Sequence, residues 1–473
     1  MTDGYDAVVV GSGPNGLAAA ITLARAGQRV LVMEGGTTVG GGMRSLELTE
    51  AGFLHDICSA IHPMGIASPF FQQLNLARYG LTWIQPPLPV VHPLDHHPAV
   101  TLDRNFGRTA AGLGDFDGEQ WRRLLEAPAK EWRQLMEMVL GPWPLPKHPL
   151  ALIRFGLGAI WPAELLAKSW FRGERARALF GGLAAHAIQP LNWPLTSSFG
   201  MVLGLLAHAV GWPIARGGSQ AIADAMTAYL CDMGGKVATG EWVKRLDELP
   251  PARAVLLDVT PRQFVAMAGD RMPLNYRHQL LSYRYGPGVC KVDYALREPV
   301  PWFDPLCAQA GTVHLGGTLQ EIASGEAMIW QGYHAAHPFV LVAQPSLFDE
   351  SRAPAGKHTL WAYCHVPHGS FLDVSHSIET QIERFAPGFR DCILAKRVHT
   401  AVEMAAYNPN YVGGDINGGV QNWRQLWTRP TPRLNPYTTP IPNVYLCSSA
   451  TPPGGGVHGM AGYNAARTVL ARI

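Results

Sequence analysis

The chain has 473 residues, and its 38 Lys and Arg against 36 Asp and Glu give a formal net charge of +2. With 47% hydrophobic and only 16% charged residues, it is an ordered globular protein, long enough for two domains with sizeable cores. The small net charge and the lack of a basic stripe exclude nucleic acid as a partner.

The N-terminal segment predicts a strand, a glycine turn, a helix and a second strand that ends in an acid. An apolar run at 8–10 leads into the motif G-S-G-P-N-G at 11–16. The first glycine of such a motif allows the turn, the second lets a pyrophosphate approach the backbone, and the third lets helix and strand pack closely. We therefore expect a dinucleotide-binding turn made of Gly11, Gly13, Pro14, Asn15 and Gly16.

Glu34 restricts the choice of dinucleotide, because it closes the second predicted strand. A carboxylate there can bind both hydroxyls of an adenosine ribose and would repel the extra phosphate of NADP. Glu34 and the adjoining Gly35 therefore indicate FAD or NAD.

The most apolar stretch is 150–167, in a Trp-rich region that we expect to be helical. Arg154, Pro162 and Glu164 interrupt it, so we do not expect a helix that spans a membrane. We expect a helical layer that walls a substrate pocket. The alternative is a patch at a membrane surface, which would take a greasy substrate from the bilayer.

Several later segments predict a further helix and more strands. A helix is expected after Gly217 and Gly218, ending near 234. Continuous or alternating apolar runs predict strands at 236–239, 242–246, 255–260, 289–296, 312–315, 339–344 and 359–366. We expect the last four to form an antiparallel sheet that carries one wall of the substrate site.

The C-terminal segment predicts a buried strand, a Gly/Pro loop and a helix with a glycine-rich start. The loop contains three consecutive glycines at 454–456, which let a large planar group lie against bare backbone. N–H groups at the start of that helix can bind the electron-rich pyrimidine edge of a flavin. We therefore expect FAD, with Gly455, Gly456 and Val457 at the flavin.

Six motifs spread along the chain carry a resemblance to a known family. They are G-G-G-M-R at 40–44, H-D-I-C-S-A-I-H-P at 55–63, G-G at 217–218, R-A-P at 352–354, N-P-N-Y-V-G-G-D at 408–415 and P-P-G-G-G-V-H-G-M at 452–460. With these motifs the sequence resembles the phytoene desaturase-like flavoproteins of the amine oxidase superfamily, in the branch of the pyridine nucleotide-disulphide oxidoreductase domain-containing type. The resemblance covers nearly the whole chain, and its last motif is the most specific.

The resemblance implies further contacts to FAD. Arg44 would lie near the pyrophosphate or the flavin, and the backbone of Val243 would contact the adenine. Ser449 stands near the position where many superfamily members carry an acid for the ribityl chain, so a serine hydroxyl or a backbone amide would replace that acid. The remaining cofactor contacts that it implies are Gly41, Gly42 and Met43.

The predicted fold class is α/β, with a Rossmann-like FAD-binding domain interleaved with a mixed-sheet plus helical substrate domain. The expected segments are 1–70, 213–268 and 439–473 for the FAD-binding domain, 71–212 for a helical substrate or cap region, and 269–438 for a substrate domain with an antiparallel sheet.

Two histidines are candidate catalytic residues. His458 is expected in the first turn of the flavin-facing helix, where it would touch flavin or substrate and move a proton, or else pack or cap. His62 lies in a segment that, by the resemblance, lines the flavin. Lys291 and Lys357 match no motif and are expected at the surface. The histidines at 92, 96 and 97 lack partners at ligand spacing, so we expect no metal site.

Together these features predict an FAD-dependent oxidoreductase of the phytoene desaturase-like type. It would desaturate or saturate a C–C bond of an apolar isoprenoid- or lipid-like substrate by hydride transfer to flavin N5. A single dinucleotide motif makes oxygen, a quinone or a protein carrier the expected electron acceptor. Two alternatives stay open: a flavin amine or alcohol oxidase that uses O2, and a flavin-bound scaffold or interaction protein without turnover.

The cysteines and the N-terminus bear on location. Seven scattered cysteines without a C-x-x-C pair indicate free thiols in a reducing compartment. The cofactor strand begins within the first ten residues, which leaves no room for a signal or transit peptide. We therefore expect a cytoplasmic protein, with contact to a membrane surface as the open alternative.

Overall fold

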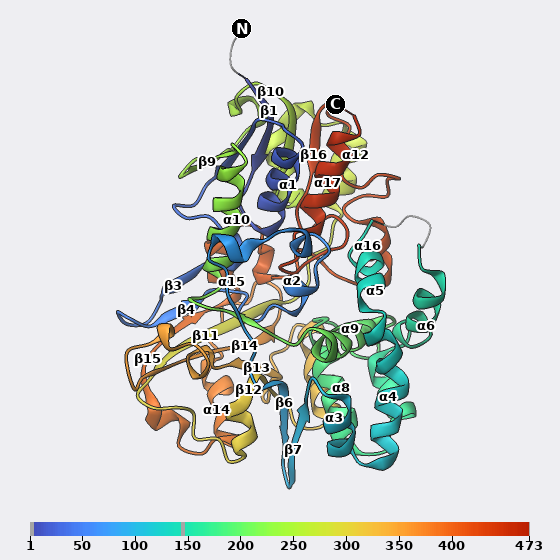
Figure 1. Cartoon of the computed structure of the whole chain (residues 1–473), viewed down its shortest axis with the longest axis vertical. Coiled ribbons are helices and arrows are strands. Elements are labelled where there is room, and N and C mark those ends of the chain that lie inside the picture. The colour runs from blue at the N-terminus through green and yellow to red at the C-terminus, as the bar shows by residue number, and fades with distance from the viewer. Residues whose placement is uncertain (1–3, 143–146, 473) are drawn as a thin grey trace.

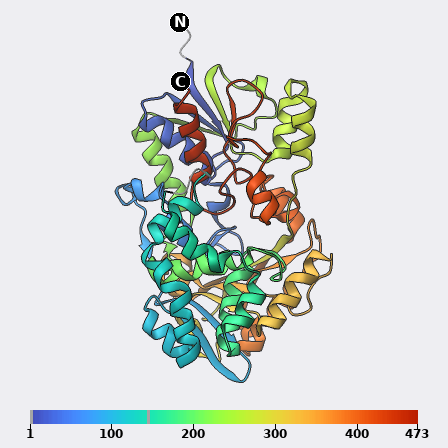
Figure 2. The ribbon, with the colours of Figure 1, turned by 90° about the vertical axis from the view of Figure 1, so that its right-hand side faces the viewer.

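The computed structural model of the chain describes residues 4–142 and 147–472. Two large sheets follow one another along the long axis of the molecule, and the first strand and the last helix lie at the same end (Figure 1). Helices between residues 106 and 209 lie beside the second sheet. A quarter turn brings these helices to the front (Figure 2).

The first sheet is parallel and has five strands in the order β16-β10-β1-β2-β9. Their bounds are β1 (Tyr5–Val10), β2 (Val30–Glu34), β9 (Lys236–Thr239), β10 (Ala252–Leu257) and β16 (Val444–Leu446). The strands thus come from three separate stretches of chain. Parallel sheets are buried on both faces, which explains the continuous apolar runs of β1 and β10.

Helices cover both faces of this sheet. The helices are α1 (Pro14–Arg25), α10 (Gln220–Asp232) and α17 (Met460–Leu470) on one face, and α11 (Pro261–Ala268) and α12 (Leu274–Leu281) on the other. Val9 packs in the first layer and Val10 in the second, as the two-residue period of a strand requires. A Cβ at Gly462 would lie 1.7 Å from the carbonyl oxygen of Asn15, so glycine sets the close contact of α1 and α17.

The second sheet is mixed and has seven strands in the order β15-β11-β14-β13-β12-β6-β7. Their bounds are β6 (Leu88–Leu94), β7 (His97–Leu102), β11 (Gly288–Leu296), β12 (Ala310–Leu315), β13 (Val340–Ala343), β14 (His358–Val366) and β15 (Ile393–His399). The four strands predicted as an antiparallel sheet lie in it, and β12 also pairs in parallel with β6. The α/β fold with a parallel sheet and a separate mixed sheet confirms the predicted class.

The two faces of the seven-stranded sheet differ in chemistry. One face is apolar and packs with α14 (Ser375–Phe385), as Val292 and Ala362 do against Ile378. The opposite face is buried as well, yet it carries polar and aromatic side chains. These are His92, Lys291, Asp293, Thr312, His314, Trp361, Tyr363 and His365.

The predicted helical region, 71–212, is helical only in part. Its segment 83–102 forms β5 (Trp83–Ile84), β6 and β7, and the helices follow between residues 106 and 209. Its helices are α3 (Phe106–Leu113), α4 (Asp115–Lys130), α5 (Trp132–Val139), α6 (Pro149–Ala159), α7 (Ala163–Trp170), α8 (Glu174–Ala185) and α9 (Thr196–Ala209). Within the described residues no single helix has the length and apolar composition of a membrane span. The pair α6 and α7 passes that test together, but it is bent by 88°.

The remaining elements are short or lie at the edges of the two sheets. They are β3 (Ser45–Glu47) with β4 (Leu54–Asp56), β5 (Trp83–Ile84) with β8 (Ile214–Ala215), and the helices α2 (Pro63–Ala67), α13 (Leu319–Trp330), α15 (Ala401–Tyr407) and α16 (Trp423–Thr428).

Two expectations about local structure are wrong. The predicted strand 242–246 is a loop, because β9 is the edge of its sheet and the chain turns at Gly240, with φ of +75°. Lys291 is not at the surface: its side chain is buried and paired with Asp293, the next residue on the same face of β11. Lys357 is exposed, as predicted.

The three histidines at 92, 96 and 97, for which no metal site was expected, lie in different surroundings. His92 is buried in β6, and its Nε2 donates to the carbonyl oxygen of Gly317 at 2.7 Å. His96 and His97 lie exposed in the β6–β7 hairpin. Among the described residues no group of three or more His, Cys, Asp or Glu side chains could hold a metal ion.

A buried ion pair joins three distant parts of the chain. Arg352 lies 2.6 Å from Asp56, and each is about 1% exposed. Asp56 also accepts hydrogen bonds from the hydroxyl of Ser45 and from the backbone N–H of Ser219, just before α10. Although burial alone would raise it, Arg352 and these donors hold the pKa of Asp56 below its usual range.

Removing one partner of this pair should be more harmful than removing both. Arg352→Met leaves a buried carboxylate unpaired, so we expect a loss of about 3–5 kcal/mol in the free energy of unfolding. The double variant Arg352→Met/Asp56→Asn should recover part of that loss. Urea unfolding measures both. A single-variant loss below about 1 kcal/mol would contradict the assignment of this pair as a structural contact.

Candidate active site

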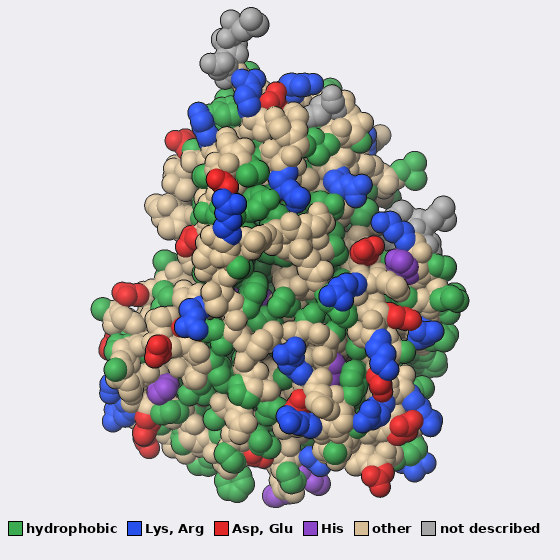
Figure 3. Space-filling model, in the orientation of Figure 1, with side chains coloured by type: hydrophobic (Ala, Val, Ile, Leu, Met, Phe, Trp, Pro, Cys, Tyr) green, Lys and Arg blue, Asp and Glu red, His purple; other side chains and the backbone are tan. Residues whose placement is uncertain are grey.

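A cavity of about 1180 Å³ lies between the two sheets. It begins at the carboxyl ends of β1 and β2 and reaches the polar face of the seven-stranded sheet, where Thr312, Leu341 and Tyr363 line it. Hydrophobic side chains gather in the hollow at the middle of the surface in Figure 3. The volume exceeds that of most single-ligand pockets, which suits a site for a large cofactor and a substrate together.

The glycine turn has the geometry that its sequence predicts. Gly11 adopts φ of +99°, and Pro14 begins α1 directly after Gly13. A Cβ at Gly16 would lie 2.1 Å from the carbonyl oxygen of Gly11, so the third glycine allows helix and strand to pack. A Cβ at Gly41 would lie 3.1 Å from Cα of Gly13. Two bare backbones therefore meet at the start of α1, where the positive end of the helix dipole favours an anion.

Most of the site residues expected from sequence line this cavity. They are Gly11, Gly13, Pro14, Asn15, Glu34, Gly35, Gly41, Gly42, Arg44, His62, Val243, Ser449, Gly455, Gly456, Val457 and His458. Gly16 and Met43 do not line it. Gly16 packs against Gly11, and the side chain of Met43 is fully buried in the core.

Glu34 is held rigidly at the end of β2. One carboxylate oxygen accepts from the backbone N–H and the hydroxyl of Ser12, at 2.8 and 2.5 Å. The other accepts from the backbone N–H of Gly36 and from Arg44, at 2.8 and 2.9 Å. Arg44 also donates to the carbonyl of Thr38. Arg44 thus fixes the loop after β2, while its contact with a cofactor stays a prediction.

Asp258 is a site residue that the sequence reading missed. It follows β10 directly, and one carboxylate oxygen accepts from the backbone N–H of Gly16 at 2.9 Å. Burial raises the pKa of Asp258 to about 7. Its position after a buried parallel strand was the available signal, because ligands bind at the carboxyl ends of such strands.

His458 does not lie in the helix, contrary to expectation. α17 begins at Met460, because Gly459 adopts a left-handed conformation with φ of +68°. Nδ1 of His458 accepts from the backbone N–H of Met460 at 3.1 Å, and Nε2 lies 3.3 Å from the carbonyl of Gly455. Burial lowers its pKa to about 4. This geometry favours the capping alternative over proton transfer.

His62 directly precedes α2. Its Nε2 donates to the hydroxyl oxygen of Ser219 at 2.8 Å, since that hydroxyl itself donates to the carbonyl of Ser59. Burial lowers the pKa of His62 to about 4, so the ring is neutral near pH 7. A catalytic role for His62 or His458 stays a prediction.

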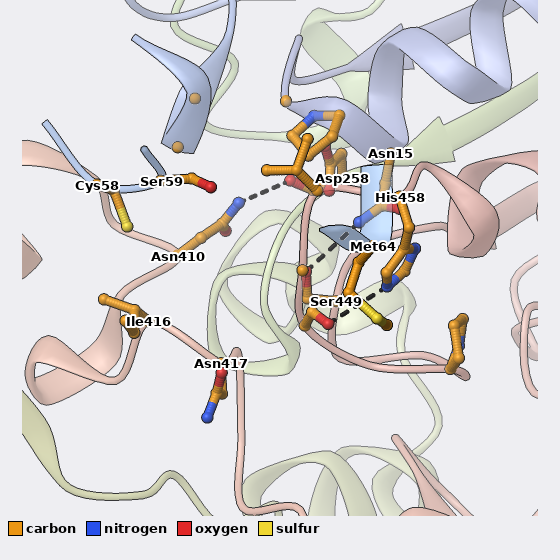
Figure 4. Close-up of a pocket in the computed structure, with 18 of the residues that line it drawn as sticks. Asn15, Cys58, Ser59, Met64, Asp258, Asn410, Ile416, Asn417, Ser449 and His458 are labelled. Atoms are coloured by element: carbon orange, nitrogen blue, oxygen red, sulfur yellow. Dashed lines mark hydrogen bonds between the residues drawn. The ribbon is translucent and has the colours of Figure 1, made fainter. Parts of the chain in front are cut away.

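The C-terminal loop closes the cavity opposite the 58–59 segment. In Figure 4, Asn15, Ser449 and His458 lie on one side of the opening and Cys58, Ser59 and Asn410 on the other. Asn15 donates to the hydroxyl of Ser449 at 3.4 Å, and Asn410 donates to the carbonyl of Asp258 at 3.0 Å. The first bond joins the N-terminal and C-terminal parts of the chain, and the second joins two central segments.

A buried cation supports this loop from behind, and no sequence motif indicated it. Arg429 is 1% exposed and donates to the carbonyl of Ser449 at 2.9 Å and to the hydroxyl of Tyr283 at 3.0 Å. Its Nε and Nη1 have no hydrogen-bond partner, and among the described residues no carboxylate lies within ion-pair distance of it. A Cβ at Gly454 would lie 2.6 Å from Nη1.

The floor of the cavity is neutral. Tyr363 and Leu341 pair across β14 and β13, and Trp212 and Phe199 form the adjoining wall. His186 also lines the cavity, and its Nε2 lies 3.1 Å from Nε2 of His314. Burial lowers the pKa of His186 to about 3. Within the described chain, the Asp, Glu, Lys and Arg side chains that line the cavity are Glu34, Arg44, Glu137, Lys147, Glu241, Lys244 and Asp258. None of them comes from the floor strands.

The pH dependence of stability offers a test of Asp258. Its folded pKa is raised above the unfolded value, so the folded state keeps a proton that the unfolded chain releases above about pH 4. Stability therefore falls as the pH rises from about 4 to about 7. Asp258→Asn removes the loss of stability that comes from ionising Asp258. At pH 8 the variant should therefore be more stable than the wild type by at most about 4 kcal/mol.

Denaturant unfolding at several pH values between 5 and 8 measures this difference. The matched control is Asp270→Asn, because Asp270 is exposed and should keep the wild-type pH slope. Equal slopes for Asp258→Asn and the wild type would show that Asp258 is ionised in the folded protein at low pH.

Comparisons with known proteins agree with this geometry. The model of the NAD(P)-binding Rossmann-like domain matches residues 9–74. The chain is 25% identical to pyridine nucleotide-disulfide oxidoreductase domain-containing protein 2 of Rattus norvegicus, over 98% of this chain and 93% of that protein. It is also 25% identical to phytoene dehydrogenase of Streptomyces griseus, over 82% and 77% of the two chains.

Solved structures show the same fold. A double mutant of putrescine oxidase superposes with a TM-score of 0.63 at 18% identity, over 99% of both chains. The comparisons confirm the resemblance to the pyridine nucleotide-disulfide oxidoreductase domain-containing and phytoene dehydrogenase proteins and support an oxidoreductase, and the putrescine oxidase structure shares the fold.

Proposed function

We propose that the protein is an FAD-dependent oxidoreductase that desaturates, or in reverse saturates, a C–C bond of an apolar isoprenoid- or lipid-like substrate. One observation carries the proposal: a single cavity joins a dinucleotide-binding glycine turn to a neutral and largely apolar floor. A bound flavin would supply hydride acceptance. The protein would bind and orient the substrate and exclude water.

The residues present fit FAD. Gly11 and Gly13 leave bare backbone at the start of α1 for a pyrophosphate, and Glu34 stands where an adenosine ribose would follow. Val243 lines the same end of the cavity. At the other end, Gly455 lies so close to the backbone of Asn417 that a Cβ would come within 2.6 Å of its carbonyl oxygen. A planar ring could lie flat against that loop.

The neutral floor favours an apolar substrate over an amine. A buried ammonium group needs a carboxylate or a free aromatic face. Among the described residues no carboxylate of the floor strands lines the cavity. The ring of Trp361, with its centre 5.9 Å from Nζ of Lys291, and the ring of Tyr363 do line it, so an amine would find aromatic faces but no carboxylate there. An amine or alcohol oxidase that uses O2 is therefore the second candidate.

The histidines of the cavity limit what the protein contributes to proton transfer. His62, His186 and His458 all have a pKa lowered to about 3 or 4 by burial, so each is neutral at pH 7. A neutral ring can accept a proton but carries no imidazolium proton to donate. Electrons are proposed to leave to oxygen, a quinone or a protein carrier, because the chain contains a single dinucleotide motif.

The first experiment is to purify the protein, precipitate it with acid and record the absorbance of the supernatant. We expect free FAD. Anaerobic titration should then bleach the flavin with apolar isoprenoids or lipids and not with primary amines. Bleaching by amines with stoichiometric peroxide would support the oxidase instead. A flavin that no substrate of either class reduces would support the scaffold alternative.

Arg429 gives a second prediction. Its buried charge lies behind the loop at Gly454, where it would favour negative charge on the pyrimidine edge of a bound flavin. Arg429→Met should make the midpoint potential more negative and weaken sulfite binding to the flavin at least tenfold. Arg429→Lys should recover part of both effects.

The control for Arg429 is Arg352→Met, which removes another buried arginine outside the cavity. It should lower stability and leave the potential unchanged. If Arg429→Met and Arg352→Met shifted the potential equally, the charge of Arg429 would have no specific action on the flavin.

A further inference from the structure

One helix of the cavity wall exposes an apolar face to solvent. On α6, the side chains of Leu150, Ile153 and Leu157 are 75%, 60% and 69% exposed, and Ile160 directly after the helix is 59% exposed. These four residues are called the α6 face below. Hydrophobic side chains gather over α6 at the right-hand edge of Figure 3.

α6 is not an ordinary amphipathic helix with one apolar and one polar side. The opposite side of α6 is also apolar, with Phe155 in the core and Gly158 against Met201. Arg154 is its one charged residue and pairs with Glu131. A helix that is apolar all round is normally buried in protein or in lipid. Here one side has no protein cover among the described residues.

The same helix lines the cavity. Leu152, Phe155 and Gly156 face the cavity, and Ile160 belongs both to the cavity lining and to the exposed face. Whatever covers the α6 face therefore lies at the edge of the substrate site. A protein partner seated there would close the site, whereas a bilayer would supply apolar molecules to it.

Neighbouring elements extend the apolar surface. Trp161 and Leu165 continue it into α7, and they are 43% and 48% exposed. On α16, Trp423 is 54% exposed, and Leu426 and Trp427 line the cavity. Both α6 and α16 lie at the right-hand side of Figure 1, the side that faces the viewer in Figure 2.

We propose that the α6 face inserts into the surface of a lipid bilayer and that the substrate enters the cavity from that bilayer. α6 and α7 together have the apolar composition of a membrane segment, and their 88° bend suits a hairpin that lies in the interface. Exposed Leu and Ile bind lipid through apolar burial, at about 25 cal/mol per Å². Only the second half of the proposal, the source of the substrate, rests on the proposed function.

The charges beside this surface predict the kind of lipid. Lys168 pairs with Glu164, Arg154 pairs with Glu131, and Lys147 lies 3.9 Å from Glu137. Because these cations have acidic partners, the attraction to anionic lipid is small. Binding should therefore occur on neutral phosphatidylcholine vesicles and change little between low and high salt.

The test is flotation of the purified holoprotein with phosphatidylcholine vesicles. The wild type should float, and Ile153→Glu/Leu157→Glu should partition at least tenfold more weakly while it keeps its full flavin content. The matched control is Leu274→Glu/Leu281→Glu, which changes two exposed leucines of α12 in the other half of the molecule. That variant should float like the wild type.

Three outcomes would overturn the proposal. The first is a wild type that does not bind vesicles, and the second is equal binding by both double variants. The third is a dimer in sedimentation that Ile153→Glu/Leu157→Glu dissociates, since a second copy would then cover the α6 face. Vesicle binding involves no turnover, so the flotation results can be interpreted even if the proposed reaction is wrong.

Discussion

Close approach of bare backbone is the constraint on which the rest of the structure depends. Gly16 lets α1 start directly over β1, Gly41 brings the next loop onto Gly13, and Gly462 brings α17 onto α1. A single Cβ would block the contacts at Gly16 and Gly462 and would crowd the one at Gly41. The parallel pairing of β1, β10 and β16 places the carboxyl ends of these strands beside one another, and Asp258 and Ser449 therefore face the cavity from neighbouring positions.

The seven-stranded sheet has two roles, because one face belongs to a hydrophobic core and the other forms the floor of the cavity. Its alternation separates the two tasks: Val292 and Ala362 pack against α14, while Lys291 and Trp361 lie on the other face. Several polar atoms on that second face have no partner in the described chain, among them Nε1 of Trp361 and Oγ1 of Thr312. Buried polar groups of this kind usually bind water or a ligand, which fits a face turned toward a cavity.

Local motifs predicted the parts of the site that depend on contiguous residues. The glycine turn, Glu34 and the 455–457 loop all line the cavity, because each owes its shape to its own few residues. Asp258, Arg429 and Lys291 were missed, because their roles arise from partners far along the chain or from the sheet face on which they lie. Lys291 and Asp293 are two residues apart in an apolar run, and that spacing was a usable sign of a buried pair on one side of a strand.

The charges of the cavity divide it into three zones, and the division bears on the chemistry. Glu34, paired with Arg44, and Asp258 lie at the glycine turn, the cation of Arg429 lies behind the C-terminal loop, and the floor around Tyr363 is neutral. In the low dielectric of a buried site, an unpaired cation favours any electron density that develops near it. A neutral floor, in contrast, offers nothing to a charged substrate in exchange for its lost hydration. The arrangement therefore suits a reaction in which charge changes on the cofactor side while the substrate enters and leaves uncharged.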